Sequence, residues 1–360
     1  MPKDPMFTPF SLRKMTLKNR LVMSPMCQYS ASDGTVNDWH LVHLGSRAIG
    51  GSGLVITEMT NVSPEGRISA GCAGMYKPQH LEAWKRIVDF VHNNSDAKIG
   101  IQLAHAGRKA SCQVAWEGGK PLNNELAWEI IAPSPIPFSE DSQTPKQMAG
   151  LDFQLLLKAF SQATIWANEA GFDMIEIHAG HGYLLSSFIS PLSNIRNDEY
   201  GGSLENRMKL PIDVFRAIRK NWPEDKPISM RISAVDWVEG GTTADDAVEI
   251  GYMMKKEGLD IIDVSSGNVT NDPRPHMKGL YQTPFSERIR NESQIPTMTV
   301  GNVSGPEQIN EIIASKKADL CCMAKGQLYN PYFAHHSARA LEVENYSWPK
   351  QYAAAPFYKP

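Results

Sequence analysis

Eight short apolar segments recur along the chain, and they constrain its fold more than any other feature. Most of them are nearly continuous runs of apolar or β-branched residues, without the polar alternation of a half-exposed strand. This texture is typical of parallel strands that are buried on both faces. The segments are residues 20–26, 54–59, 99–105, 174–180, 228–233, 261–267, 296–301 and 320–326.

Amphipathic segments lie between these runs. In residues 153–171 apolar side chains such as Phe153 and Leu156 recur at helical spacing, and Gly171 provides a stop. Other helices are expected at 81–94 after Pro78, at 206–222, at 245–258 and in the segment opened by Ser304 and Pro306. Eight strands that alternate with helices predict an α/β fold, a (β/α)8 TIM barrel, with a doubly wound parallel sheet as the competing interpretation.

Residues 106–150 interrupt the alternation. This stretch contains PSPIPF and EGGKP and is too long for an ordinary connection between a strand and a helix. We expect an extended loop insertion after the third strand that forms a lid or side wall. No shift in composition marks a second domain, so the prediction is one domain over residues 1–360.

Composition and charge exclude several classes of protein. With 42 % hydrophobic and 21 % charged residues, the chain has material for a large core and too little charge for extensive disorder. Lys and Arg number 36 against 39 Asp and Glu, and the net charge of −3 argues against nucleic-acid or anionic membrane partners. The expected ligand is a small molecule.

The N-terminal sequence and the cysteines indicate the compartment. MPKDPMFTPF lacks the apolar core of a signal peptide, and no apolar run approaches the roughly 18–20 residues that cross a bilayer. The five cysteines have no CxxC spacing and are expected to be reduced thiols, without a disulfide framework or a four-thiolate metal site. A cytoplasmic location is the expectation.

Polar residues cluster where the predicted strands end. Barrel enzymes place their chemistry at the carboxyl ends of the strands, so these side chains are expected to meet in one mouth. They are Ser24, Pro25, Met26, Cys27, Gln28 and Tyr29 after the first strand, Gln102 and His105 in the third, His178, His181 and Tyr183 after the fourth, and Arg231 in the fifth.

The segment HAGHGY permits three interpretations. His178 and His181 can bond the backbone at the strand end, as many histidines do. They can ligate a metal, with His105 or Glu176 as a third ligand, because Glu176 shares a strand face with His178. They can also act as neutral donors that polarise a carbonyl, with Tyr183 as the proton donor.

Two further features suggest a bound anion. Arg231 lies among apolar residues of its strand, so its charge requires either an internal salt bridge or an anion in the mouth, such as a reduced flavin. Gly301 and the run Ala324, Lys325, Gly326 follow the last two strands. Such glycines serve tight turns, but barrels also bind phosphate there, and the adjacent lysine favours a phosphorylated ligand such as FMN.

Five longer motifs carry a resemblance that spans nearly the whole chain. They are LKNRLVMSPMCQYS (17–30), EGRIS (65–69), GIQLAHAGRKAS (100–111), FDMIEIHAGHGYLLSSFISPLSN (172–194) and NDEYGGSLENR (197–207). In these motifs the chain resembles the bacterial branch of the Old Yellow Enzyme family of FMN-dependent ene-reductases.

The resemblance implies a non-covalently bound FMN across the barrel mouth. It places the backbone of Ser24, Pro25 and Met26 near the flavin ring and Cys27 near its reactive edge, where the thiol tunes redox behaviour and touches substrate. Gln102 would bond the pyrimidine edge, and Arg231 would stabilise the reduced ring. Met59 stands where relatives often have alanine. Gly301, Ala324 and Lys325 stand in the loops expected to bind the phosphate, where Ala324 and Lys325 replace the glycine and arginine that are usual in the family.

The resemblance also implies the reaction. His178 and His181 would hold the oxygen of an α,β-unsaturated carbonyl or nitro compound, with Tyr29 contacting the substrate. NAD(P)H reduces FMN and leaves, and hydride then passes from flavin N5 to the β-carbon while Tyr183 protonates the α-carbon. Relatives are commonly dimers or tetramers, so a homo-oligomer is expected. The tail lacks the family's arginine or tryptophan, and Phe357 or Tyr358 are the available substitutes.

Two other functions compete with this one. A metal-dependent barrel hydrolase would use His178 and His181 as ligands. A flavin-binding or storage protein without catalysis is opposed by the presence of both histidines and Tyr183.

Overall fold

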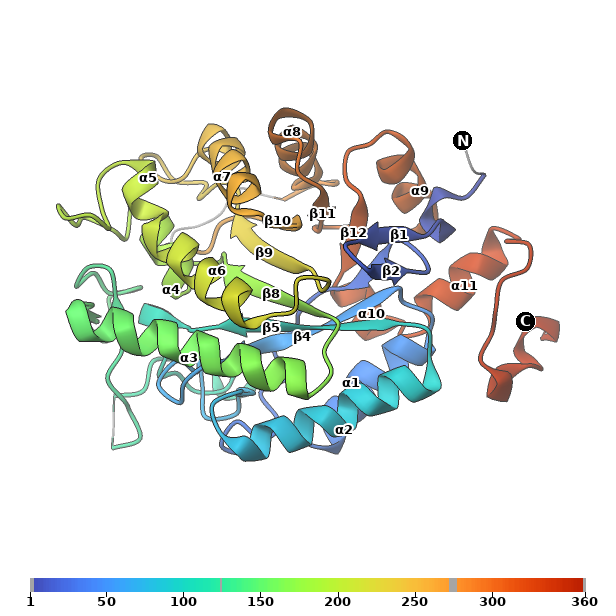
Figure 1. Ribbon diagram of the computed structural model, residues 1–360, viewed down its shortest axis with the longest axis horizontal. Coiled ribbons are helices and arrows are strands. Elements are labelled where there is room, and N and C mark those ends of the chain that lie inside the picture. Colours follow the sequence, from blue (N-terminus) through green and yellow to red (C-terminus); the bar gives the residue numbers. More distant parts are fainter. Residues whose placement is uncertain (1–2, 124, 272–276, 359–360) are drawn as a thin grey trace.

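The computed structural model describes residues 3–123, 125–271 and 277–358 (Figure 1). Eight parallel strands form a closed barrel in chain order, and the last pairs with the first. They are β3 (Leu21–Met23), β4 (Leu54–Asn61), β5 (Lys98–Ala104), β8 (Met174–Ala179), β9 (Ile228–Ser233), β10 (Ile261–Ser265), β11 (Thr297–Thr299) and β12 (Leu320–Met323). Each coincides with one of the eight apolar segments. The TIM-barrel prediction is confirmed, and the doubly wound sheet is wrong.

Helices surround the barrel (Figure 1). They are α1 (Asp38–Ile49), α2 (Pro78–Asn94), α3 (Gly150–Glu169), α4 (Leu184–Ile189), α5 (Leu204–Arg207), α6 (Lys209–Asn221), α7 (Ala244–Glu257), α8 (Thr283–Ser293), α9 (Pro306–Ala314), α10 (Lys325–Tyr329) and α11 (Phe333–Ala340). All five expected helical segments are present, the one at 206–222 divided between α5 and α6. Single turns of 3-10 helix are η1 (Pro5–Phe7), η2 (Gly107–Lys109), η3 (Ala115–Glu117), η4 (Lys350–Tyr352) and η5 (Ala355–Phe357).

Local sequence sets the ends of α7. The side chain of Thr243 accepts a hydrogen bond from the Asp246 backbone N–H, and the Asp246 carboxylate accepts one from the Thr243 backbone N–H. This reciprocal cap satisfies donors that the first turn leaves open. Gly258 ends the helix at a φ of 96°, a left-handed conformation that favours glycine.

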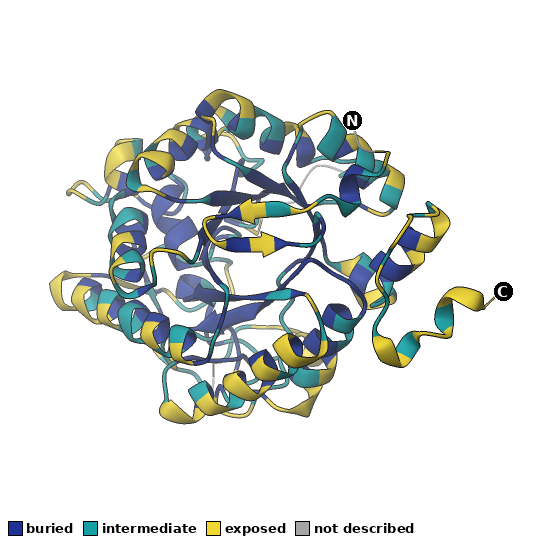
Figure 2. Cartoon of the chain, turned by 45° about the vertical axis from the view of Figure 1, so that its right-hand side comes forward, coloured by how far each residue is buried: buried dark blue, intermediate teal, exposed yellow. Residues whose placement is uncertain are grey.

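A β-hairpin closes the amino-terminal end of the barrel, and it was not expected from the sequence. Its strands are β1 (Phe10–Leu12) and β2 (Met15–Leu17), and Figure 2 shows the pair lying across the barrel opening. Leu12, Met15 and Leu17 form one buried apolar cluster with barrel residues such as Leu54 and Met298. A ligand therefore enters the barrel from the opposite, carboxyl end of the strands.

Residues 106–150 connect β5 to α3, as expected. They contain η2, η3 and a short parallel pair, β6 (Ile131–Ala132) with β7 (Lys146–Gln147). The segment lies at the end of the molecule opposite the C-terminal tail (Figure 1). Across the described ranges, the helices are too short or too polar for any of them to span a membrane.

We expect Leu17→Ala to destabilise the protein because Leu17 is fully buried in the cluster that plugs the barrel. The lost contacts and the residual cavity should lower the free energy of unfolding by about 3 kcal/mol. Val42→Ala is the matched control, since Val42 on α1 is 66 % exposed, and its effect should stay within about 0.5 kcal/mol. Urea unfolding measures both. Equal effects would show that the hairpin does not contribute to the barrel core.

Candidate active site

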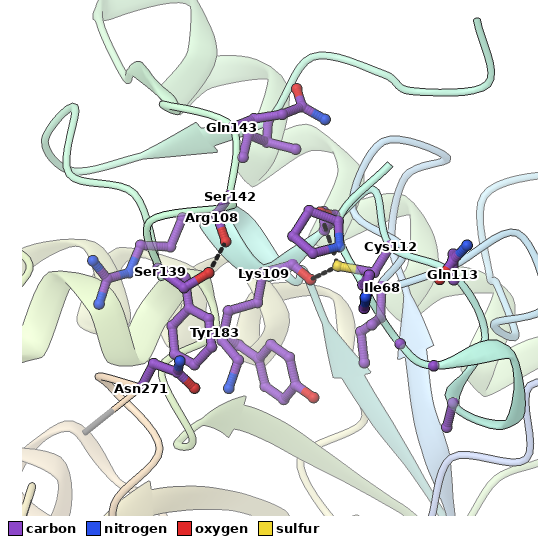
Figure 3. A pocket seen from close by; sticks show the side chains of 18 of the residues that line it. Ile68, Arg108, Lys109, Cys112, Gln113, Ser139, Ser142, Gln143, Tyr183 and Asn271 are labelled. Atoms are coloured by element: carbon purple, nitrogen blue, oxygen red, sulfur yellow. Dashed lines mark hydrogen bonds between the residues drawn. The ribbon is translucent and has the colours of Figure 1, made fainter. Parts of the chain in front are cut away.

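Two cavities open at the carboxyl ends of the barrel strands. The inner cavity, of about 250 Å³, is lined by Arg231, Ser265, Gln282, Gly301, Ala324, Lys325 and their neighbours. The outer cavity, of about 370 Å³, is lined by Tyr29, Tyr183 and many residues of the 106–150 segment (Figure 3). The strand ends therefore hold two spaces, one of them walled by the insertion.

His178 and His181 contact residues of both cavities. Their rings meet edge to face, with His178 Nε2 3.3 Å from His181 Nδ1. His181 also bonds Ser265 of the inner cavity, and the His178 ring packs against Tyr183 of the outer cavity at a centroid distance of 5.0 Å. The structure thus brings together the two histidines and the tyrosine that the HAGHGY motif singled out.

The surroundings keep the His178 ring neutral and the Tyr183 phenol protonated. Burial lowers the pKa of His178 well below its ordinary value, and the positive charges of Arg231 and Lys109 lower it further. Burial, with Cys27 and Tyr29 nearby, raises the pKa of Tyr183 well above its ordinary value. At neutral pH the site therefore contains an uncharged imidazole and an intact phenol, as hydrogen-bond donation to a carbonyl requires.

Lys109 is a site residue that the sequence analysis missed. Its ammonium donates to the backbone oxygens of His181 at 2.9 Å and Asn268 at 3.1 Å, and it lies 5.1 Å from the centre of the Tyr183 ring. Figure 3 shows the Lys109 and Tyr183 side chains side by side in the outer cavity. Lys109 therefore fastens the insertion to the loops after β8 and β10.

Arg231 forms an internal salt bridge and also lines a cavity, so both interpretations of its sequence position apply. It lies beside Asp263 in the strand register, with Nε 3.3 Å from the carboxylate, and its Nη1 donates to Ser24 Oγ at 3.1 Å. Burial opposes the charge, but Asp263 and Glu176 outweigh it and raise the pKa of Arg231. The guanidinium also lines the inner cavity, so an internal salt bridge and a cation for a bound anion coexist.

Glu176 is fully buried in the barrel wall and is hydrogen-bonded to neighbouring side chains. The Glu176 carboxyl accepts two hydrogen bonds. Gln102 Nε2 donates one at 2.9 Å, and Ser229 Oγ donates the other at 3.0 Å. Burial and the neighbouring Asp263 raise the pKa of Glu176 to about 8. Gln102 is therefore buried, with its amide bonded to a largely protonated carboxyl, and its contact with a flavin stays a prediction.

The expectation that His105 faces the mouth is wrong. Strand β5 ends at Ala104, so the alternation of the strand no longer fixes the direction of the next side chain. His105 Nδ1 accepts a hydrogen bond from the Gly107 backbone, and the ring lines a separate hollow with Ser63 and Glu65. In the ranges that the structure describes, no three His, Cys, Asp or Glu side chains form a metal-binding group. The metal-hydrolase alternative therefore lacks a ligand set here.

Cys27 is a half-buried thiol beside the outer cavity. Burial, with Cys72 and Glu58, raises its pKa well above the ordinary value, so it is a neutral and polarizable group. It packs in one apolar cluster with Met59, Tyr29 and Tyr183. Ser24, Pro25 and Met26 follow β3 directly and lead the chain to this cluster.

The inner cavity has the chemistry that FMN requires. The buried Arg231 lines this cavity and supplies a positive charge. Gly301 turns the chain at a φ of 105°, and a Cβ there would lie 2.7 Å from Gln282 Nε2, so a side chain does not fit. Ala324 and Lys325 complete the wall. The charges of Arg231 and Lys325 and the tight turn at Gly301 suit a ligand that carries both a phosphate and an electron-accepting ring.

Phe357 and Tyr358 do not complete this site within their own chain. Both are exposed, at 83 % and 67 %, and the tail packs beside α11, where Arg339 bonds the Tyr358 backbone oxygen. Figure 1 shows this tail at the end of the molecule opposite the insertion. The proposed substitution for the family's C-terminal residue is therefore wrong for a single chain.

The raised pKa of Glu176 predicts a pH-dependent stability. The unfolded chain loses this proton near the ordinary value of 4.5, whereas the folded chain holds it to about pH 8. Between these values stability falls by up to about 1.4 kcal/mol per pH unit. Glu176→Gln preserves the neutral shape, so its stability relative to the native protein should rise from pH 5 to pH 8 in urea titrations at fixed FMN. Glu82→Gln on the exposed face of α2 is the control, and a pH-independent difference for Glu176→Gln would contradict the assignment.

Comparison with known proteins identifies the family. The model of the NADH:flavin oxidoreductase / NADH oxidase family matches residues 5–344. The chain is 45 % identical over 341 residues to an NADPH dehydrogenase of Geobacillus thermodenitrificans, covering 94 % of this chain and 95 % of that protein.

Solved structures share the fold. Morphinone reductase superposes with a TM-score of 0.78 at 22 % identity, covering 100 % of this chain and 94 % of that one. A 2-naphthoyl-CoA reductase complex superposes with a TM-score of 0.84 at 23 % identity, and there the match covers 94 % of this chain but 53 % of the longer protein. The chain belongs to the NADH:flavin oxidoreductase / NADH oxidase family, the Old Yellow Enzyme family, and is an NAD(P)H-dependent flavin oxidoreductase with FMN as its cofactor.

Proposed function

We propose that the protein reduces the carbon–carbon double bond of α,β-unsaturated carbonyl compounds. The observation that carries this proposal is the pair of facing ring nitrogens, His178 Nε2 and His181 Nδ1, beside Tyr183 of the outer cavity and Ser265 of the inner cavity. Ring nitrogens at this position can donate hydrogen bonds to a carbonyl oxygen, and among the described residues no group of three His, Cys, Asp or Glu side chains offers a metal site. A nitro oxygen can occupy the same place.

The residues of the inner cavity would hold FMN. When bound, FMN supplies the redox chemistry, taking a hydride from NAD(P)H and delivering it from N5 to the substrate β-carbon. Arg231 would stabilise negative charge on the reduced ring, and Gln102 would bond its pyrimidine edge. The contact residues proposed for the ring and phosphate are Ser24, Pro25, Met26, Cys27, Met59, Gly301, Ala324 and Lys325.

The substrate would lie in the outer cavity with its carbonyl oxygen at the histidines. Hydrogen bonds from His178 and His181 draw electron density toward that oxygen and stabilise the enolate that forms when hydride reaches the β-carbon. Tyr183 then breaks its O–H bond and gives the proton to the α-carbon, and water reprotonates the phenolate. Tyr29 would contact the substrate, and the 106–150 insertion would exclude water as a lid or side wall.

Other expectations accompany this proposal. The name of the 45 % identical relative supports NADPH as the reductant. A single domain over residues 1–360, a homo-oligomer and a cytoplasmic location remain predictions from the sequence.

The double variant His178→Ala, His181→Ala tests the proposal. It should bind FMN normally, because the proposed FMN contacts do not include either ring, but lose most of its affinity for phenol. Removing an oxyanion-type donor typically costs about 100-fold or more in rate, so reduction of cyclohex-2-enone should slow at least that much. Stopped-flow flavin reoxidation measures this step, and His336→Ala, an exposed histidine on α11, is the control. Loss of FMN with retained enone chemistry would assign the pair to the cofactor and refute the proposal.

Cys27→Ala should shift the flavin potential and leave measurable turnover. The thiol is neutral and no covalent step passes through it, so its removal changes the environment of the flavin without removing a nucleophile. Spectroelectrochemical titration measures the potential. Cys321→Ala, a buried cysteine packed in the apolar cluster with Met6 and Leu21, should leave it unchanged. Complete inactivity of Cys27→Ala at normal flavin content would contradict the assigned role.

A further inference from the structure

A chain of hydrogen bonds crosses the histidine pair and ends on the backbone at both sides. The Gly180 N–H lies 3.3 Å from His178 Nδ1, and His178 Nε2 lies 3.3 Å from His181 Nδ1. On the far side, His181 Nε2 lies 2.6 Å from Ser265 Oγ, and Ser265 Oγ lies 3.3 Å from Gln282 Oε1. Gln282 Nε2 then lies 2.8 Å from the Val300 backbone oxygen.

The backbone at one end fixes the direction of the first bonds. The Gly180 N–H can only donate, so His178 Nδ1 accepts, and the neutral ring carries its proton on Nε2. That proton points at His181 Nδ1, which must then accept. His181 consequently carries its own proton on Nε2 and donates it to Ser265.

The other end requires the same direction. The Val300 oxygen can only accept, so the Gln282 amide nitrogen faces it and the Gln282 carbonyl oxygen faces Ser265. Ser265 therefore donates to Gln282 and accepts from His181. Two independent backbone groups agree on one proton arrangement for the whole chain.

This arrangement is unfavourable for holding a carbonyl oxygen between the rings. His178 Nε2 would donate to such an oxygen, but His181 Nδ1 would present a lone pair to it. Both rings can donate only if the His181 proton lies on Nδ1, and His181 Nε2 then needs a donor. The Ser265 hydroxyl is 2.6 Å away and can become that donor by rotating about its C–O bond.

The neighbourhood of Gln282 allows that rotation. Ser266 Oγ donates to the same Gln282 oxygen at 2.7 Å, a shorter bond than the one from Ser265. When Ser265 turns away, the Gln282 oxygen keeps a donor and no buried acceptor is left unsatisfied. Half-buried His181 can exchange protons with water, losing one from Nε2 and gaining one at Nδ1 without a change in net charge.

We infer that Ser265 is a positioning residue that sets the tautomer of His181 and reverses its hydrogen bond when a carbonyl oxygen binds between the two rings. The reversal rests on the proposed function. The tautomer of the ligand-free protein does not, because it follows from the hydrogen-bond chain alone.

Nitrogen-15 NMR of the oxidised holoenzyme, labelled at histidine, tests this inference. His181, assigned by comparison with His181→Gln, should carry its proton on Nε2 without ligand and on Nδ1 with cyclohex-2-enone, which the oxidised flavin does not reduce. Ser265→Ala should show a mixture of both tautomers. Ser233→Ala is the matched control, because Ser233 Oγ accepts a hydrogen bond from the His181 backbone N–H. In this variant the His181 tautomer should be the same as in the native protein.

Binding measures the same reversal. Loss of the Ser265 donor should raise the Kd of cyclohex-2-enone about 5- to 10-fold, the equivalent of one neutral hydrogen bond. Ser265→Thr keeps the hydroxyl and should restore the native affinity. Flavin absorbance confirms that each variant retains FMN.

The outcomes separate the inference from the proposed function. A His181 proton on Nδ1 in the ligand-free protein, or a tautomer unchanged by bound enone, overturns the inference even if the enone is reduced normally. If the enone neither binds nor is reduced, the proposed function fails. In that case the ligand-free spectra of the native protein and Ser265→Ala still decide whether Ser265 sets the tautomer.

Discussion

Closure of the barrel places charged and polar side chains from neighbouring strands into one shared interior, and the site depends on how they compensate one another. The register sets Gln102 beside Glu176 and Arg231 beside Asp263. A buried charge without a partner would be strongly destabilising. The Asp263 carboxylate therefore makes it possible to keep a permanent cation at the mouth, where a flavin can use it.

The same cation affects the protonation of His178. His178 stands opposite Arg231 in the register, and the charge adds to burial in lowering the pKa of the imidazole. A neutral imidazole can polarise a carbonyl but does not transfer its proton outright. Protonation is thus left to the phenol of Tyr183, on the side of the outer cavity. In the proposed reaction, the imidazoles therefore polarise the carbonyl oxygen of the substrate, and a different residue, Tyr183, protonates its α-carbon.

The sequence predicted the barrel because continuous apolar runs and helical spacing are local patterns. It also predicted that His178, His181, Tyr183 and Arg231 meet, since each directly follows or lies within a strand. The prediction failed for His105, one residue beyond the end of β5, where strand alternation no longer fixes a direction. The β1–β2 hairpin was missed because its strands are only three residues long and their burial depends on the distant barrel.

The proton arrangement could not be predicted from the sequence. Ser265 ends the sixth barrel strand, so its place in the mouth was accessible, but its partner Gln282 precedes α8 and gives no local signal. The polarity of the chain depends on two backbone groups far apart in sequence, the Gly180 N–H and the Val300 oxygen. A hydroxyl can either donate or accept, whereas an amide held by the backbone cannot change roles. The flexible member of the chain is therefore the serine, which contacts the ring that must change its proton.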